Sequence, residues 1–361
     1  MKIATRAAVL VTASALALAA CGAAPEEEPE ETTAGGEEET AEEIDFKGCI
    51  VSDQGGFDDR SFNQAGYEGL QLAQESLGIE TAQAESTAET DFVPNIDSMV
   101  NQACDLTVTV GFLLAGATGE AAEANPDATF AIIDDQSIDL PNVKPIVFNT
   151  AEAAFLAGYL AAGYSTTGTV ATFGGMAIPP VTIFMDGFVD GVAHYNETKG
   201  AEVEVLGWNK DDQSGEFTGN FEDIAAGQNV ANAFIDAGAD VIMPVAGPVG
   251  GGAASAAQEA GDVAFIGVDS DWFDTSPEYA DIILTSVLKQ MGPAVFDVIN
   301  ESVQDNFSNE AYVGTLENEG VALAPFHDLD STVSAELKSE LEEIQAQIVA
   351  GDIVVESQST P

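Results

Sequence analysis

Acidic, amide and aromatic side chains stand where short apolar segments of this sequence end. Asp53 follows one such segment, and Ser61, Phe62 and Asn63 open the helical pattern that comes next. Carboxylate, hydroxyl and amide groups can hydrogen-bond the polar edge of a small molecule, and an aromatic ring can stack on a flat one. These residue types therefore make the segment a candidate binding loop.

Further apolar segments end in the same way. Asp134 with Asp135, and then Asp269, follow two other apolar segments, and Lys289 follows a fourth. Such acids can bind hydroxyls or an amine, and Lys289 could neutralise Asp269 or donate to a ligand. Structural explanations stay open: Asp134-Asp135 as turn residues, Lys289 as a surface lysine and Phe62 as a core residue.

Two glycine-containing segments lie before predicted helices. Phe221 stands in the segment 219–223, which opens a helix. The segment 244–252 contains Gly247 and joins a strand to a helix, but it lacks the G-x-x-x-x-G-K-[ST] pattern of a phosphate-binding loop. No Lys or Arg lies nearby. We therefore expect its backbone to approach an uncharged ligand closely.

The elements that position these residues alternate between strand and helix. Near-continuous apolar strands separated by amphipathic helices predict an α/β fold with parallel sheets covered on both faces. The pattern restarts near residue 151, which predicts two doubly wound halves with ligands beyond the carboxyl ends of the strands. The predicted strands are 48–52, 106–110, 129–133, 145–148, 169–173, 203–206, 240–245, 263–268 and 282–287, and the helices are 61–77, 151–164, 181–196, 223–237, 250–260, 291–303 and 331–349.

The first 45 residues predict a signal for export and lipidation, followed by a flexible tether. Lys2 and Arg6 precede an apolar run over 7–20, which is typical of a secretory signal peptide. The sequence Leu-Ala-Ala-Cys-Gly ending at residue 22 resembles a bacterial lipobox, which implies cleavage after residue 20 and lipidation of Cys21. An ordinary signal peptide with a chance cysteine is the alternative. Residues 21–45, rich in Glu, Pro and Thr, predict a disordered acidic tether.

The net charge excludes some classes of partner. The chain has 62 Asp and Glu against 9 Lys and Arg, a formal net charge of −53. Such a chain repels nucleic acid and anionic lipid headgroups. We therefore expect no nucleic-acid partner, and contact with a membrane through the lipid anchor only.

Two cysteines remain besides Cys21. Cys49 and Cys104 stand at the starts of two apolar strands, and neighbouring parallel strands would bring those starts close together. A disulfide between them is plausible outside the cytoplasm. Two separate buried thiols are the alternative, because the sequence does not show the distance.

Taken together, these segments resemble the basic membrane protein family, the purine-nucleoside-receptor type of bacterial lipoprotein. The resemblance implies a type I periplasmic-binding-protein fold, in which two doubly wound parallel-sheet lobes are joined by a three-strand hinge. It implies a first lobe over 46–148 plus 285–308 and a second over 149–284 plus 309–355. The motifs that carry it are DQGGFDDRSFNQ (53–64), EAAFLAG (152–158), GGM (174–176), GF (187–188), GADVI (238–242) and GVDSD (267–271).

The resemblance also implies a ligand site. Members of the family hold the purine between two phenylalanines, which match Phe62 and Phe221 by motif position. The base-contacting acid matches Asp53. The other residues implied as ligand contacts are Ser61 and Asn63 beside the base, Gly247, Asp269 and Lys289 at the ribose, and Asp134.

The function expected on these grounds is solute capture for an ABC importer. The protein would be a monomer, lipid-anchored on the outer face of the bacterial cytoplasmic membrane, with an ABC permease and ATPase as partners. It would bind a nucleoside, expected to be a purine nucleoside, without cofactor, metal or catalytic residue. The alternatives are a binding protein for a sugar or other small solute, and a metal-dependent nucleoside hydrolase using Asp53, Asp58, Asp59 and Asp134. His194 and His327 lie outside that acid cluster, and the G-x-S-x-G motif is absent.

Overall fold

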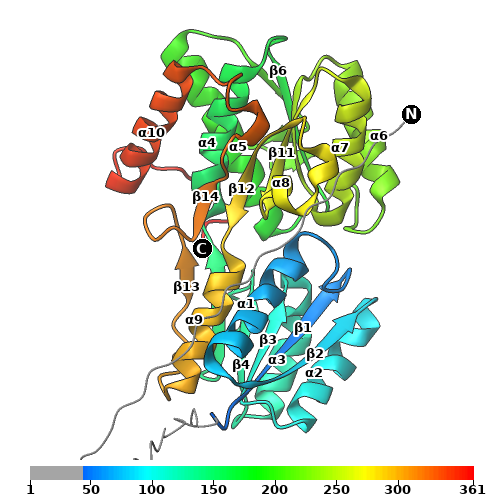
Figure 1. Ribbon diagram of the computed structural model, residues 1–361, viewed down its shortest axis with the longest axis vertical. Helices are drawn as coiled ribbons and strands as arrows, with labels where there is room; N and C mark the ends of the chain where they lie inside the picture. Colours follow the sequence, from blue (N-terminus) through cyan, green and yellow to red (C-terminus); the bar gives the residue numbers. More distant parts are fainter. Residues whose placement is uncertain (1–43) are drawn as a thin grey trace, which may run out of the picture. The chain divides into compact units, whose positions relative to one another are not determined.

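The computed structural model describes residues 44–361. The predicted signal peptide, Cys21 and residues 21–43 of the predicted tether lie outside the described residues. The described part contains two six-stranded sheets, each with helices on both faces (Figure 1). This is the α/β architecture with parallel-sheet lobes that the alternating apolar pattern predicted.

The first sheet is parallel throughout. Its strand order is β13-β5-β4-β3-β1-β2. The strands are β1 (Lys47–Gln54), β2 (Glu80–Ser86), β3 (Leu106–Val110), β4 (Thr129–Ile133), β5 (Val143–Phe148) and β13 (Tyr312–Gly314).

The second sheet repeats this order with different strands. Its order is β14-β12-β11-β10-β6-β7, and only the edge strand β14 runs antiparallel to its neighbour. The strands are β6 (Thr169–Gly174), β7 (Glu204–Leu206), β10 (Val241–Val245), β11 (Ala264–Asp269), β12 (Ile283–Lys289) and β14 (Val321–Leu323). A short antiparallel hairpin of β8 (Trp208–Asn209) and β9 (Ser214–Gly215) follows β7.

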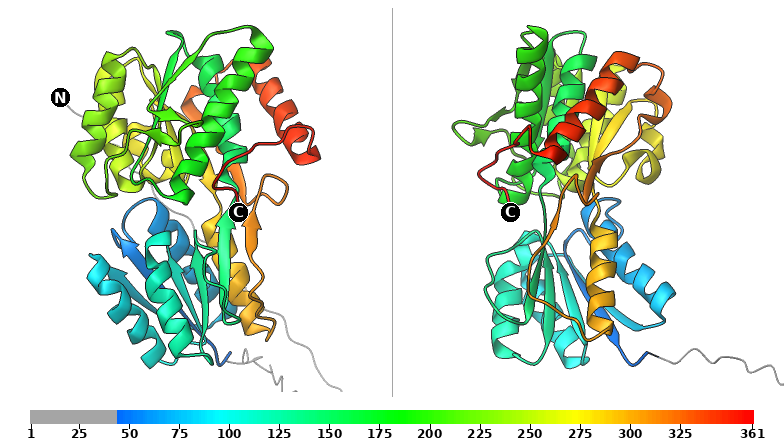
Figure 2. Two further views of the ribbon diagram at one scale, coloured as in Figure 1. Left: turned by 180° about the vertical axis from the view of Figure 1, so that it is seen from behind. Right: turned by 90° about the vertical axis from the view of Figure 1, so that its left-hand side faces the viewer.

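Helices cover both faces of each sheet because successive strand residues point to opposite faces. In β1, Ile50 packs with the core that contains α1 and α9, and Val51 packs with the core beneath α2 and α3. Figure 2 shows the corresponding helix layers from two further directions. The helices are α1 (Phe62–Leu77), α2 (Phe92–Asn101), α3 (Ala115–Ala124) and α9 (Met291–Val303) on the first sheet, and α4 (Thr150–Tyr164), α5 (Pro179–Lys199), α6 (Ile224–Asp236), α7 (Gly250–Ala260), α8 (Trp272–Thr275) and α10 (Ala335–Ala350) around the second.

The chain passes between the two lobes three times. The passages join β5 to α4, β12 to α9, and β13 to β14. The lobe boundaries differ from the predicted ones in two places. Residues 285–289 were placed in the first lobe, but β12 pairs with β11 of the second sheet. Residues 312–314 were placed in the second lobe, but β13 pairs with β5 of the first. Both errors fall on strands beside a passage, where the apolar pattern is the same on either side.

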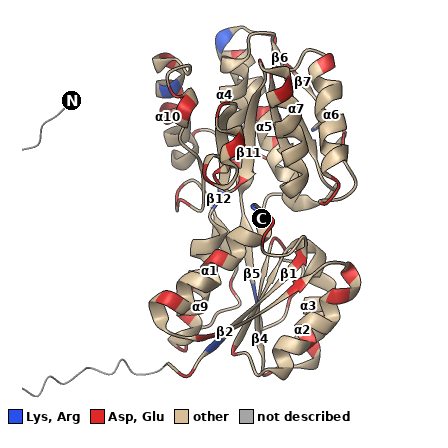
Figure 3. Ribbon diagram, turned by 45° about the vertical axis from the view of Figure 1, so that its right-hand side comes forward, with Lys and Arg blue, Asp and Glu red and all other residues tan. Residues whose placement is uncertain are grey.

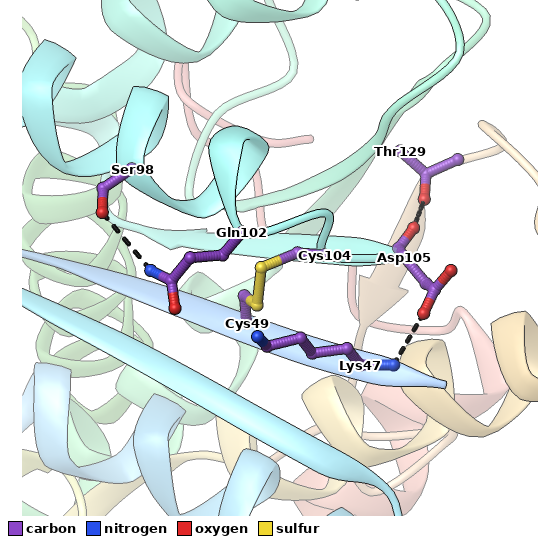
Figure 4. Close-up of a disulfide and its surroundings, with 7 residues drawn as sticks. All are labelled: Lys47, Cys49, Ser98, Gln102, Cys104, Asp105 and Thr129. Carbon is purple, nitrogen blue, oxygen red and sulfur yellow. Dashed lines mark hydrogen bonds between the residues drawn. A yellow bond between two sulfur atoms is a disulfide. The ribbon is translucent and has the colours of Figure 1, made fainter. Parts of the chain in front are cut away.

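The disulfide predicted as one alternative is present in the structure. Cys49 and Cys104 are joined, and their Cα atoms lie 6.0 Å apart (Figure 4). The two cysteines meet because β1 and β3 are parallel neighbours, as the register Cys49 to Thr107 shows. Beside them, the backbone nitrogen of Lys47 donates to Asp105 at 2.7 Å. The bond therefore ties the amino-terminal ends of β1 and β3, two neighbouring strands of the first sheet.

None of the helices among residues 44–361 has the length and apolar character needed to cross a bilayer.

Replacing both Cys49 and Cys104 with alanine should lower the free energy of unfolding by about 4 kcal/mol, because the bond closes a loop between residues 55 positions apart in the unfolded chain. Urea titration under oxidising and reducing conditions measures this. The natural protein should lose stability when reductant is added, and the double variant should not respond to reductant. Equal stability of the two proteins under oxidising conditions would contradict the prediction.

Candidate functional site

A cavity lies between the carboxyl ends of the strands of the two sheets. It contains about 590 Å³ of space not filled by protein atoms, a figure that includes the open solvent at its mouth. Both lobes supply its walls. Eight of the nine sequence-predicted contact residues line it: Asp53, Phe62, Asn63, Asp134, Phe221, Gly247, Asp269 and Lys289. The ninth, Ser61, reaches the cavity wall indirectly, because its hydroxyl donates to Asp269 at 3.4 Å.

The loop between β1 and α1 is organised by Asp59. Its carboxylate accepts from the backbone nitrogens of Ser61, Asn63 and Gln64 at 2.9, 2.9 and 3.0 Å. Ser61 stands at the N-cap position of α1, but its side chain makes no capping hydrogen bond. Asp59 supplies that acceptor from two residues upstream, so the Ser61 hydroxyl is free to contact Asp269.

Asn63 holds Asp53 in place. Its amide nitrogen donates to Oδ1 of Asp53 at 2.8 Å, and its amide oxygen accepts from the Asp53 backbone nitrogen at 3.2 Å. Asn63 is buried in the first turn of α1, so the pair is fixed at the end of β1. Asn63 therefore acts on the site by positioning Asp53.

Gly111 leaves the room that this arrangement needs. A Cβ atom at Gly111 would lie 2.4 Å from Oδ2 of Asp53 and 3.3 Å from a ring carbon of Phe62. Its φ of +117° is in addition a conformation that side-chain-bearing residues rarely adopt. The Asp53 carboxyl and the edge of the Phe62 ring are thus neighbours on one wall of the cavity.

The second lobe presents Phe221 from the loop before α6. A Cβ atom at Gly175 would lie 2.3 Å from the Phe221 ring, so the ring packs directly on the backbone that follows β6. Gly247 lies after β10 with φ +51° and also lines the cavity. Gly247 therefore contributes backbone to the cavity wall, and the close approach of that backbone to a ligand stays a prediction.

Asp134 and Asp269 occupy equivalent positions in the two lobes. Asp134 follows β4 and Asp269 ends β11, and these strands are third in their respective sheet orders. Both residues have left-handed backbone, with φ of +69° and +70°. Such a conformation is strained for a residue with a side chain and is concentrated at functional sites. The matching strain turns two carboxyl groups into the same cavity from opposite lobes.

Lys289 links these acids across the lobes. Its ammonium group forms an ion pair with Asp134, and the exposed fractions of the two side chains are 2% and 7%. The same ammonium lies 4.8 Å from the ring centroid of Phe62 and 5.5 Å from that of Phe148. The suggested pairing with Asp269 is not formed as a salt bridge. Lys289 instead stabilises the charge of that carboxylate from a distance.

Burial dominates the protonation of the three acids. It raises the pKa of Asp53 to about 8, and neighbouring Asp59, Asp134 and Asp269 add to this rise against the hydrogen bond from Asn63. Burial also raises the pKa of Asp269 to about 6, although Lys289 opposes the rise. The pKa of Asp134 is raised by burial as well, and its ion pair with Lys289 opposes that.

Sequence reasoning missed several residues of the cavity wall. Asp59 was interpreted only as a helix-terminal or metal-binding acid. Gly111 and Phe112 lie at the carboxyl end of β3 as Asp53 lies at that of β1, and this shared strand-end position was the signal available. The apolar side chains contributed by α5 and by the residue before it gave no signal, because their spacing is that of a core helix: Ile178, Pro180, Val181 and Phe184.

The arrangement suits noncovalent binding. Among residues 44–361, no group of three or more His, Cys, Asp or Glu side chains is placed to hold a metal ion. His194 packs beside Phe155 and Tyr159. His327 bonds Asp271 at 2.7 Å and stacks on Phe273. Neither histidine lines the cavity.

Comparison with known proteins identifies the family. Residues 46–359 match the Bmp family, described as "ABC transporter substrate-binding protein PnrA-like". The chain belongs to the Bmp family. The resemblance seen in the sequence motifs is thereby confirmed, and Bmp proteins are substrate-binding components of ABC transporters rather than enzymes.

Individual relatives agree with this membership in the Bmp family. The "ABC transporter nucleoside-binding protein BmpA" of Lactococcus lactis is 31% identical over 333 residues, covering 87% of this chain and 90% of the relative. An "uncharacterized lipoprotein" of Pyrococcus horikoshii is 31% identical, covering 79% of this chain and 69% of the relative. A solved solute-binding protein of an Aeropyrum pernix ABC transporter system has a TM-score of 0.77 at 25% identity, covering 86% and 94% of the two chains. The type I periplasmic-binding fold is thus confirmed.

The raised pKa of Asp53 predicts a loss of stability with rising pH. The folded protein keeps a proton up to about pH 8 that the unfolded chain releases near pH 4. The stability that this proton confers is therefore complete below pH 4 and is lost as the pH rises towards 8. Between pH 5 and pH 8, the free energy of unfolding should decrease less in Asp53→Asn than in the natural protein, by about 1 kcal/mol or more. Urea titrations at both pH values measure it, with the exposed Asp58→Asn as the control. Parallel pH dependence in the natural protein and Asp53→Asn would contradict it.

Proposed function

We propose that this protein binds a purine nucleoside between its lobes and delivers it to an ABC permease. The observation that carries the proposal is that Phe62 and Phe221, one from each lobe, line the same cavity. Two half-buried rings on opposite lobes suit a flat guest, because aromatic stacking is favourable with any base. The name of the Lactococcus lactis relative supports the same class of ligand.

The polar groups of the cavity match an uncharged ligand with hydroxyl groups. Among the described residues of the cavity wall, Lys289 is the single basic one, and it is already paired with Asp134. A phosphate group would call for arginine or several unpaired cations. Ribose hydroxyls can instead donate to Asp269 and accept from Lys289, whose amino group has three donors. The acidic residues spread over both lobes (Figure 3) would likewise repel a nucleotide.

The location follows from the family and from the first residues of the chain. ABC substrate-binding proteins work outside the cytoplasm at a membrane. The lipobox-like sequence at Cys21 supports a lipid anchor on the outer face of the cytoplasmic membrane, with residues 21–45 as the tether. A monomer that presents both lobes to the permease and its ATPase completes this proposal.

Removal of either ring should weaken binding of a nucleoside. Phe62→Ala and Phe221→Ala should each raise the dissociation constant about tenfold to a hundredfold, because stacking contributes about 1–3 kcal/mol per base. Isothermal titration calorimetry with a panel of nucleosides, free bases and pentoses measures this. Phe273→Ala is the matched control, because Phe273 stacks on His327 away from the cavity.

Three outcomes of that titration would contradict the proposal. Unchanged nucleoside binding in both Phe62→Ala and Phe221→Ala would show that the two rings do not hold the nucleoside. Saturable binding of pentoses alone would favour a sugar receptor. Consumption of the nucleoside during the titration would point to an enzyme.

Lys289→Met should weaken the binding of nucleosides much more than the binding of free bases, because the lost hydrogen bond is to the ribose. A hydrogen bond to a charged group contributes about 1.5–3 kcal/mol, which corresponds to about tenfold to a hundredfold in affinity. Lys144→Met is the control, because Lys144 is a second buried lysine that bonds the backbone of Glu310 outside the cavity. Circular dichroism of each variant checks that it is folded. Equal weakening of nucleosides and free bases would remove Lys289 from the ribose subsite.

A further inference from the structure

The cavity contains three buried carboxyl groups and one lysine. Asp53, Asp134 and Asp269 are contributed by the ends of three strands, and Lys289 forms its ion pair with Asp134. Among residues 44–361, no lysine or arginine forms an ion pair with Asp53. One cation cannot compensate three buried negative charges, so the site favours keeping a proton on an acid.

Asp53 is the acid placed to keep that proton. The charged groups around it are Asp59 from the loop before α1, Asp134 after β4, Asp269 at the end of β11, and Lys289 at the end of β12, which is held by Asp134. Three of these four are negative. Burial together with these neighbours raises the pKa of Asp53 to about 8, so its protonated form predominates at neutral pH.

Both oxygens of Asp53 keep hydrogen-bonding capacity for a ligand, because a carboxyl oxygen has two lone pairs and Asn63 uses only one of those on Oδ1. Oδ1 accepts from Asn63, whereas Oδ2 faces the space left by Gly111, beside the edge of the Phe62 ring. A flat ring stacked on Phe62 would therefore present an edge to the Asp53 carboxyl. The chemical state of this carboxyl then decides which edges fit.

The two protonation states of a carboxyl group accept different partners. A protonated carboxyl has one donor and acceptor capacity, whereas a carboxylate has acceptors only. The edge of adenine pairs an acceptor, N1, with a donor, the N6 amino group. The edge of guanine presents two adjacent donors, N1–H and the N2 amino group. Adenine is therefore complementary to the protonated acid and guanine to the carboxylate.

We infer that Asp53 makes the base preference of this site depend on pH, with adenosine bound by the protonated acid and guanosine by the carboxylate. This inference rests on the proposed function. It assigns to one side chain a choice between two purine nucleosides that share a ring system and a ribose.

The size of the effect follows from proton linkage. The adenosine complex holds one more proton than the guanosine complex, so the ratio of guanosine to adenosine affinity should rise about tenfold per pH unit. This slope depends on the difference of one proton between the complexes and not on the exact pKa of the free site. A base whose edge does not match the protonation state of Asp53 leaves a buried polar group unpaired. Each nucleoside therefore binds weakly to the protonation state that the other one prefers.

The experiment is calorimetric titration of the protein with adenosine and with guanosine at about pH 6, 7 and 8, where neither base titrates. Each titration is repeated in two buffers of different ionisation enthalpy, which gives the number of protons exchanged. Guanosine binding should release about one proton more than adenosine binding at each pH. The affinity ratio should follow the tenfold slope.

Two variants separate Asp53 from the other acids. Asp53→Asn has a permanent donor and acceptor, so it should bind adenosine at every pH and lose both guanosine binding and the pH-dependent ratio. Asp269→Asn should retain the pH-dependent ratio even where both affinities fall.

The outcomes distinguish this inference from the proposed function. Binding of both nucleosides with equal proton exchange and a constant ratio would overturn the inference and leave nucleoside binding intact. Retention of the pH-dependent ratio in Asp53→Asn would also overturn it. Absence of binding for both nucleosides at every pH would overturn the proposed function and the inference together.

Discussion

The ion pair of Lys289 with Asp134 is the interaction on which the cleft depends. It joins the end of β12 in one lobe to the end of β4 in the other, and both side chains are almost fully buried. A buried pair recovers its desolvation cost only with good geometry and additional contacts, and here the rings of Phe62 and Phe148 supply further contacts to the ammonium group. Because this pair uses the one basic side chain of the described cavity wall, Asp53 is left without a cation.

The matching strand orders of the two sheets explain how such a site is assembled from distant residues. Each lobe repeats the same unit, and each ends its third strand in an aspartate with left-handed backbone. The connection after β3 is repeated after β10. Gly111 precedes a short 3-10 turn and α3, and Ala246 precedes a second short 3-10 turn and α7. Opposed copies of one strand-end arrangement therefore give a cavity with acids from both sides, and each lobe adds an aromatic ring from its own loops, Phe62 and Phe221.

Most elements with a strong apolar pattern were predicted from the sequence, although α2 was missed despite its buried stripe of Phe92, Ile96 and Met99. The strands at 106–110 and 129–133 and the helices at 250–260 and 291–303 were predicted to the residue. β2 (Glu80–Ser86) was missed because it is a polar edge strand, and α3 because its alanines and glycines give no apolar stripe. The motif resemblance indicated the main cavity residues. The capping role of Asp59 and the space at Gly111 depend on three-dimensional packing that spacing does not encode.

The disulfide lies at the opposite end of β1 from Asp53. Asp53 is four residues after Cys49, which corresponds to about 13 Å of strand, and the sulfur atoms pack in the core beneath α2 and α3, away from the cleft. Oxidation of the cysteines can therefore proceed independently of the groups that select the solute. A copy in which the bond has not formed would populate its unfolded form more often, so the bond acts on the stability of the protein and not on the walls of the cleft.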